Sequence, residues 1–518
     1  MQDFVIILPR VAAFLFVFAF GACVGSLINV LAYRLPRGMG VVTPASRCPF
    51  CGTKLRWKDN IPIFGWLFLR GKCRYCKSGI SPEYPLVELF AASLFALFSI
   101  MWYLVPAFGG SNYELLGLNL GSVRPDWAFV DRFNGVPAAS APIFAVVLLM
   151  LGSLLAMTLT DLKTTMIPLV LPWFATLAGL LIHTIYAGYL SVRGVEYSMP
   201  AADMAWRWAI PTYGWVSVGL GVGGIVGLGL SMLMLKVGLI RRSFADAEQW
   251  EEEHRKANGL PPLEPLDGGD GEEEDDGKTE TGQWRPTPGW LRGPLVITTT
   301  VLLCAVIGGF VAKFLGHAPG IGVLIGAAVG PIAAGLPLRL LVPSAKPADD
   351  DDPSDAEVWI AYPHARREMV KEMAFLAPPV VGAWIGVLFA SGFEGFPPLW
   401  LEVLGGVLLG YLVGGGVVWA VRLFGSLGFG KEAMGLGDVH LMAAVGACIG
   451  WADAGLAFFG AAFVGILVTF YSLSLSRGVG RAMPYGPSLA IATVLVLLFK
   501  PAIELGLSRM TGQVINLP

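Results

Sequence analysis

Four of the seven cysteines lie in two Cys-x-x-Cys pairs, formed by Cys48 with Cys51 and by Cys73 with Cys76. Each pair presents two thiolates from one tight turn, and two such pairs complete a tetrahedral shell, which is typical of a structural zinc site. Because a four-thiolate shell has no open position, we expect the metal to hold together a loop too small to fold alone. Two disulfides, a redox-active pair or a rubredoxin-like iron site are the alternatives, and a cytoplasmic location would disfavour disulfides.

Two aspartates lie at the ends of apolar segments. Asp161 follows one such segment directly, and Asp438 begins another, in the sequence Gly435-Leu436-Gly437-Asp438. Two neighbouring carboxyl groups, one keeping its proton and one ionised, can share a water and hydrolyse a peptide without a covalent intermediate. The glycines at 435 and 437 would let a backbone approach the carboxylate closely. Taken alone, an aspartate at a helix end is more often an N-cap or an interface residue.

The segments that must position these residues are strongly apolar. The chain has 518 residues, of which 55% are hydrophobic and 14% charged, against about 25% charged in globular proteins. This composition predicts an all-α polytopic membrane protein, since a span needs about 20 apolar residues. We expect about twelve spans, near residues 11–32, 85–106, 142–160, 168–190, 213–236, 294–316, 318–342, 376–392, 399–423, 438–452, 455–476 and 485–507.

The charges predict how these spans are oriented. Residues 34–77 contain ten Lys and Arg residues against the single acid Asp59, so this loop should be cytoplasmic and the N-terminus outside. No cleavage site follows the first apolar segment, so we expect that segment to be retained. Six predicted spans separate Asp161 from Asp438, and an even number returns the chain to the same face. A net charge of -2 gives no reason to expect a nucleic-acid partner.

Glycine and acidic residues mark two further features. The 66 glycines include runs at 221–229 and 405–416, which predict helices packed closely through small residues. The cytoplasmic stretches 243–293 and 343–375 are acidic and poor in apolar residues, so we expect them to be disordered, with a short helix near 245–256. The predicted organisation is a first transmembrane helix (1–33), a four-cysteine zinc-binding loop (34–84), a first core part (85–190), an inserted region (191–398) and a second core part (399–518).

Six stretches together resemble the type IV prepilin peptidases, a family of Gly-x-Gly-Asp aspartyl membrane proteases. They are Gly21–Val30 with Tyr33–Pro36, the four-cysteine loop, Tyr84–Glu88, the Asp161 segment, Glu432–Val439 and Pro484–Pro487. The resemblance covers residues 10–106, 142–190 and 400–507. It implies that Asp161 and Asp438 are the catalytic pair and that the four cysteines bind zinc. The chain departs from the family in about four additional spans, in Leu169, where an acid is usual, and in His440, where lysine is usual.

The resemblance also implies a substrate and a location. Members of this family cleave the basic leader from prepilin-like precursors at the cytoplasmic face of the bacterial inner membrane, and many then methylate the new N-terminus with S-adenosylmethionine. The expected partners are therefore prepilin-like proteins, the lipid bilayer and components of pilus assembly or type II secretion. Acidic residues would attract the leader, and the candidates are Glu83, Glu88 and Glu432. No Gly-rich nucleotide fingerprint locates S-adenosylmethionine, so that cofactor rests on the resemblance alone.

Three other interpretations are open. An ion-coupled carrier would tolerate two buried carboxylates, but it needs neither the cysteine loop nor both aspartates at one face. A signal-peptide-peptidase-like protease shares Gly-x-Gly-Asp, but its first aspartate follows a tyrosine, whereas Thr160 precedes Asp161. The chain could also be an inactive relative, against which the presence of both aspartates argues. The inserted spans would form either a docking surface or a spacer.

Overall fold

The structure is a computed structural model that describes residues 2–99, 141–193, 210–259, 362–474 and 485–513, apart from a few single positions, together with Trp102, Trp208 and residues 114–119 in part. The predicted spans at 294–316 and 318–342 lie outside these residues. So do residues 260–293 and 343–361, the larger part of the two stretches expected to be disordered.

The described elements are almost all helical. The helices are α1 (Gln2–Arg34), α2 (Phe64–Phe68), α3 (Glu83–Ser99), α5 (Ala141–Thr164), α6 (Val170–Val192), α7 (Trp215–Lys236), α8 (Ala247–Ala257), α11 (Ala365–Ala390), α12 (Leu399–Phe429), α13 (Leu436–Ile449), α14 (Trp451–Ser474) and α15 (Gly486–Thr511), with short 3-10 turns at Leu35–Arg37 and Trp57–Asn60. Two-residue strands, β1 (Glu114–Leu115) and β2 (Leu118–Asn119), pair antiparallel.

Every predicted span that falls on described residues coincides with a helix. Among the described residues, six helices are long and apolar enough to cross a membrane, or seven if the bent α15 counts as one span, and α13 and α14 are shorter apolar helices. An all-helical polytopic membrane protein is therefore confirmed, whereas the number twelve stays a prediction. Helix α11 begins at Ala365, inside the stretch predicted to be disordered, because Glu368, Met369 and Glu372 are buried there.

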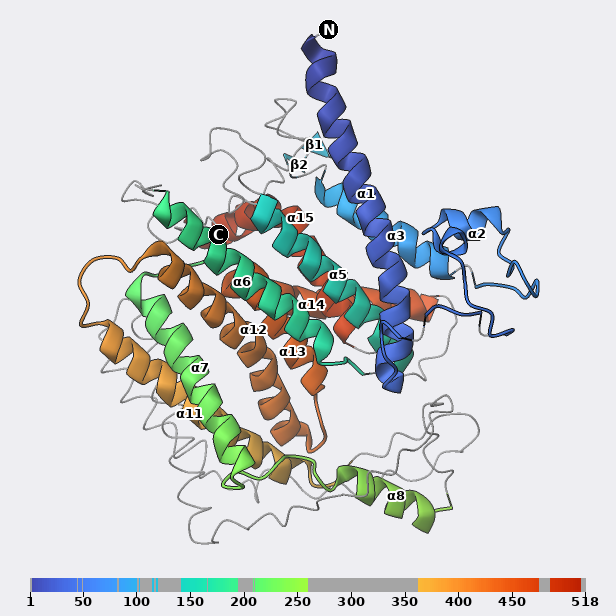
Figure 1. Cartoon of the computed structure of the whole chain (residues 1–518). Coiled ribbons are helices and arrows are strands. Elements are labelled where there is room, and N and C mark those ends of the chain that lie inside the picture. Colours follow the sequence, from blue (N-terminus) through green and yellow to red (C-terminus); the bar gives the residue numbers. More distant parts are fainter. Residues whose placement is uncertain are drawn as a thin grey trace.

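Most of the apolar core lies among α5, α6, α12, α13, α14 and α15 at the centre of the bundle (Figure 1), and Ile28 of α1 with Phe95 and Phe98 of α3 extend it. Helices α1 and α3 lie on one side of this core, and α7 and α11 lie side by side on the other (Figure 1). Side chains from α13 are buried almost without exception, although this helix has only 14 residues. A short helix surrounded in this way holds its N-terminus, and thus Asp438, in a fixed place.

Glycines allow several of these helices to touch backbone to backbone. In α7, Gly219, Gly223 and Gly227 lie against Gly386, Gly382 and Pro378 of α11, and a Cβ at any of the three would collide with the facing carbonyl. Gly410 of α12 and Gly446 of α13 make a contact of the same kind. The close packing predicted from the two glycine runs is confirmed, and the four-residue spacing is that of small-xxx-small helix pairs.

Helix α15 is bent by 80° near residue 500, where Phe499 leaves the helical conformation. At the bend, the Lys500 ammonium lies 3.1 Å from a carboxylate oxygen of Asp453 in α14, and both side chains are buried. The ion pair fixes the N-terminal half of α15 against α14. That half begins at Gly486, beside the predicted catalytic residues.

Candidate active site and metal centre

Asp161 and Asp438 come from two different helices, close to where each helix ends. Asp161 lies three residues before the end of α5, and Asp438 is the third residue of α13. Their side chains are 6% and 8% exposed. The Asp438 carboxylate accepts a hydrogen bond from the backbone N–H of Gly435, the N-cap of its own helix. This is the carboxylate half of a capping box, and it explains why an acid is stable at this position.

Gly486 lies between the two carboxylates. Its backbone N–H donates to Asp161. A Cβ built on Gly486 would lie 2.5 Å from Oδ2 of Asp161 and 3.6 Å from Oδ1 of Asp438. These two oxygens can therefore be no farther apart than the sum of the two distances. The fold brings the aspartates of α5 and α13 together around the first residue of α15.

Of the two motif glycines, one is needed for close packing. A Cβ on Gly437 would lie 3.0 Å from Cβ of Ile167, which belongs to the turn between α5 and α6. At Gly435 the nearest atoms are Oδ2 of Asp438 at 3.8 Å and the Gly437 nitrogen at 3.9 Å. Gly437 thus lets the turn after Asp161 rest on the start of α13, whereas no comparable crowding surrounds Gly435.

The arrangement has the parts of an acid–base pair. Two carboxyl groups that share one water cannot both ionise cheaply in a poorly hydrated site, so a pair of this kind can supply one acid and one base. Their position at helix ends, rather than in the middle of the bundle, places the pair at the boundary of the apolar core.

The four cysteines of the loop form a second cluster. The sulfur atoms of Cys48, Cys51, Cys73 and Cys76 all lie within 4.8 Å of one another, and no disulfide joins them. The Sγ atoms of Cys48 and Cys76 are 3.8 Å apart, about the separation of two sulfurs in a tetrahedral zinc site with bonds of about 2.3 Å. The geometry fits a metal bound by four thiolates.

The two halves of the cysteine loop are built alike. The backbone N–H of Cys48 donates to the Thr53 carbonyl, and that of Cys73 donates to the Ser78 carbonyl. In each half the residue four positions after the first cysteine, Gly52 or Lys77, has a positive φ. Backbone N–H groups of Cys51 and Phe50 lower the pKa of Cys48 to about 6. A thiolate is therefore available at neutral pH, as metal binding requires.

The three acidic candidates for leader binding occupy different settings. Glu83, at the start of α3, forms an ion pair of 2.5 Å with Lys163, two residues after Asp161. The buried Glu88 accepts a hydrogen bond of 2.6 Å from the backbone N–H of Ile63 and one from Ser26, so it joins the cysteine loop to α1 and α3. Glu432 is paired with Arg422 of α12.

The sequence interpretation did not assign Gly486 or Arg422 to the site. Gly486 belongs to the Pro484–Pro487 stretch that resembles the family, and a glycine between two prolines is the available signal. Arg422 carried a weaker signal, a single cation near the end of a predicted span. Its partners are 10 and 50 residues away in the chain, and spacing does not reveal such pairs.

Comparison with known proteins finds two family matches. Residues 19–102 match the bacterial peptidase A24 N-terminal domain, and residues 378–470 match the type IV leader peptidase family. The first range contains the four cysteines and the second contains Asp438, whereas Asp161 and Gly486 lie outside both. These matches confirm the resemblance to the type IV prepilin peptidases.

Individual relatives agree with the family matches. A prepilin leader peptidase/N-methyltransferase of Myxococcus xanthus is 48% identical over 124 residues, which are 24% of this chain and 34% of the relative. One from Klebsiella pneumoniae is 42% identical over 123 residues, 21% of this chain and 54% of the relative. A type 4 prepilin-like proteins leader peptide-processing enzyme of Escherichia coli is 37% identical over 100 residues, which are 16% of this chain and 37% of the relative. The matches thus span about a third to a half of these relatives. No solved structure matches the chain.

Proposed function

We propose that this protein is an aspartyl endopeptidase that removes the leader peptide from type IV prepilin-like precursors, with Asp161 and Asp438 as its catalytic pair. The observation that carries the proposal is the meeting of the two carboxylates around Gly486. The family matches and the names of the relatives support the reaction class. An ion-coupled carrier gains no comparable support, because both carboxylates lie at helix ends.

In the proposed reaction one carboxylate takes a proton from a water as that water attacks the scissile carbonyl. The protonated partner then donates its proton to the leaving amide nitrogen, so the pair exchanges roles without a covalent intermediate. The buried setting excludes bulk water and strengthens these charge interactions. Gly486 leaves room for both carboxylates and donates its N–H to Asp161, which orients that side chain.

Cleavage of a prepilin-like substrate in detergent tests the assignment. Asp161→Asn and Asp438→Asn should each lower kcat by about 10²-fold or more, because each removes an acid–base group. Asp246→Asn is the matched control, since Asp246 pairs with Arg367 and lies outside the pair. The new N-terminus identifies the cleaved bond. Full activity in either active-site variant would refute the assignment, and a silent wild type would refute the substrate class.

The metal proposed for the four cysteines is zinc in a structural role. The tetrad has no free coordination position, so the metal would fix the loop 34–84 and take no part in hydrolysis. Metal analysis of the purified protein should find about one zinc per chain. Iron, or a protein without metal, would contradict the choice of zinc.

The proposed second activity is N-methylation of the newly exposed N-terminus by S-adenosylmethionine. It rests on the names of the relatives, and the described residues do not locate a cofactor site. Mass spectrometry of the cleaved product should show one added methyl group only when S-adenosylmethionine is present. An unmodified product under both conditions would remove this part of the proposal.

The proposed topology is a bacterial inner-membrane protein of about twelve spans, with an exoplasmic N-terminus. The cysteine loop, both aspartates and the acidic stretches would face the cytoplasm, and the parts would be those predicted at 1–33, 34–84, 85–190, 191–398 and 399–518. Substrate would be the main partner, alongside the bilayer and components of pilus assembly or type II secretion. A reporter fused after residue 270 should report a cytoplasmic position, and an exoplasmic signal would refute the orientation.

A further inference from the structure

A buried arginine in α12 is surrounded by groups from three parts of the chain. Arg422 is 1% exposed. Its Nε lies 3.2 and 3.1 Å from the two carboxylate oxygens of Glu372 in α11, and its Nη2 lies 3.0 Å from one of them. Trp419 also donates to Glu372, at 2.7 Å. This near-bidentate pairing fixes the plane of the guanidinium.

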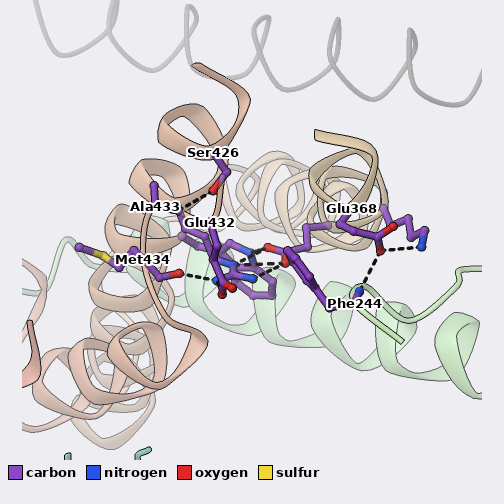
Figure 2. Close-up of polar contacts among 10 residues, drawn as sticks. Phe244, Glu368, Ser426, Glu432, Ala433 and Met434 are labelled. Carbon is purple, nitrogen blue, oxygen red and sulfur yellow. Dashed lines mark hydrogen bonds and ion pairs between the residues drawn. The ribbon is translucent and has the colours of Figure 1, made fainter. Parts of the chain in front are cut away.

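The third guanidinium nitrogen of Arg422, Nη1, contacts the segment 430–435, which connects α12 to α13. Nη1 donates to the Glu432 carboxylate and to the Met434 carbonyl (Figure 2). Beside it, the Ser426 hydroxyl accepts the backbone N–H of Ala433 at 2.9 Å (Figure 2). One guanidinium thus fastens the segment to α12 at two points, and the segment ends at Gly435, the N-cap of the helix that carries Asp438.

The geometry points to a clamp, formed by Glu372, Arg422 and Glu432, that positions Asp438 by holding the segment 430–435. This inference rests on the proposed function, since positioning matters only if Asp438 reacts. In this role Arg422 is a positioning residue, because it contacts Glu372, Glu432, Met434 and the ring of Phe244 and neither aspartate among the described contacts. It acts through the segment rather than on the reacting atoms.

The clamp makes the inserted region part of the active-site scaffold. Glu372 lies in the predicted insertion 191–398, six residues before the matched range 378–470 begins within the same helix. The connection from α7 to α8 closes the same cluster, because the Phe244 N–H donates 2.8 Å to Glu368 and the Phe244 ring lies 5.4 Å from the Arg422 guanidinium. A segment that served only as a spacer would not be expected to pair a buried carboxylate with Arg422 in the second core part.

The clamp also gives Glu432 a role different from leader binding. Glu432 is 38% exposed, so contact with a basic leader is sterically open. The two roles differ in kinetics: loss of leader binding raises KM for a basic leader, whereas loss of positioning lowers kcat. Glu432→Gln should therefore lower kcat and leave the ratio of KM values for basic and neutral leaders unchanged.

The test combines kinetics with hydrogen exchange on the full-length protein in detergent. Arg422→Lys keeps the charge but cannot hold Glu372, Glu432 and Met434 at once, and Glu372→Gln removes one carboxylate. Both should lower kcat about 10²-fold with KM changed less than about threefold. Amide exchange in residues 430–437 should rise about tenfold or more, because the segment opens locally. Arg193→Lys is the control, because Arg193 follows α6 directly, lies over the Tyr189 ring and touches none of the segment; it should change neither readout.

Three outcomes decide against the clamp, and a fourth decides against the proposed function alone. Unchanged exchange in both Arg422→Lys and Glu372→Gln would show that the segment does not depend on them. Faster exchange with unchanged kcat would show that the segment is held but that Asp438 does not need it. A selective rise of KM for basic leaders in Glu432→Gln would assign Glu432 to leader binding instead. If the wild type cleaves no prepilin-like substrate, the proposed function fails, and the exchange measurement alone still decides whether Arg422 holds the segment.

Discussion

Replacing Gly486 by alanine should disturb the catalytic pair without removing either carboxylate. The added Cβ would lie 2.5 Å from Oδ2 of Asp161 and 3.3 Å from its Cγ, and ordinary contacts begin at 3.4 Å. The Asp161 carboxylate must therefore move by about 1 Å, since repulsion rises steeply below contact distance. Oδ1 of Asp438, at 3.6 Å, is already at an ordinary contact distance.

A displacement of this size is large for an acid–base pair. A misplacement of about 1 Å costs about 10²-fold in rate, or about 2.7 kcal/mol of activation free energy, since each tenfold change in rate corresponds to about 1.36 kcal/mol. We expect Gly486→Ala to lower kcat by this factor with little change in KM, because the substrate contacts elsewhere are untouched. The variant should remain folded, since alanine suits the first turn of a helix.

Initial rates of leader cleavage over a range of substrate concentrations check this expectation. Gly506→Ala is the matched control, because Gly506 lies in the same helix and a Cβ there meets no atom within 4 Å. It should have wild-type kcat and equal or slightly higher thermal stability. Wild-type kcat in Gly486→Ala would refute the reasoning, because it would mean that the two carboxylates do not react where the structure places them.

Three further predictions concern the scaffold around this pair. Zinc should be released as the pH falls, not as it rises, because protons compete with the metal for the four thiolates; metal analysis after acid dialysis checks this, and retention at pH 4 would contradict it. Glu88→Ala should lower the free energy of unfolding by about 1–3 kcal/mol and expose the loop 34–84 to proteases, because the Ile63 N–H loses its acceptor. Glu88→Gln keeps a carbonyl oxygen as acceptor and should resist digestion. Equal digestion of the two variants would show that the bond to Ile63 does not hold the loop. Gly223→Ala should lower the free energy of unfolding by about 1–3 kcal/mol, because its Cβ collides with the Gly382 carbonyl. Gly229→Ala lies on an open face of the same helix and should leave this free energy unchanged. Equal melting temperatures of the two variants would show that α7 and α11 do not pack as described.

The sequence predicted the elements of this fold better than their contacts. Apolar length was sufficient to locate each described span, because a membrane helix is defined by local composition. Span parity predicted only that Asp161 and Asp438 lie at the same face, and their pairing was implied by the family resemblance. The cysteine cluster followed from spacing. The prediction that residues 343–375 are disordered was wrong from Ala365 onward, where α11 begins. From the sequence, Glu368 and Glu372 looked like solvent-exposed acids of a loop. Their burial depends on partners, such as Arg422, that are distant in the chain, and local patterns carry no information about such pairs.

Glu88 shows the same limit within the candidate site. As an acid at the cytoplasmic end of a predicted span, it was a reasonable candidate for attracting a basic leader. In the structure its carboxylate is occupied by the Ile63 N–H and by Ser26. Charge type can be read from a sequence, but whether a charge faces solvent or a backbone donor depends on the tertiary fold.

The glycine contacts between α7 and α11 bear on any attempt to engineer a smaller protein from this chain. They join the two helices along their length, and α11 supplies the carboxylate that faces Arg422. A shortened protein lacking residues 191–377, the part of the predicted insertion that precedes the family match, would keep both aspartates and the cysteine loop, yet it would leave a buried guanidinium without its main counter-charge. Such a design would need a compensating change at position 422, for instance to a neutral side chain, and a new way to fasten the segment before α13.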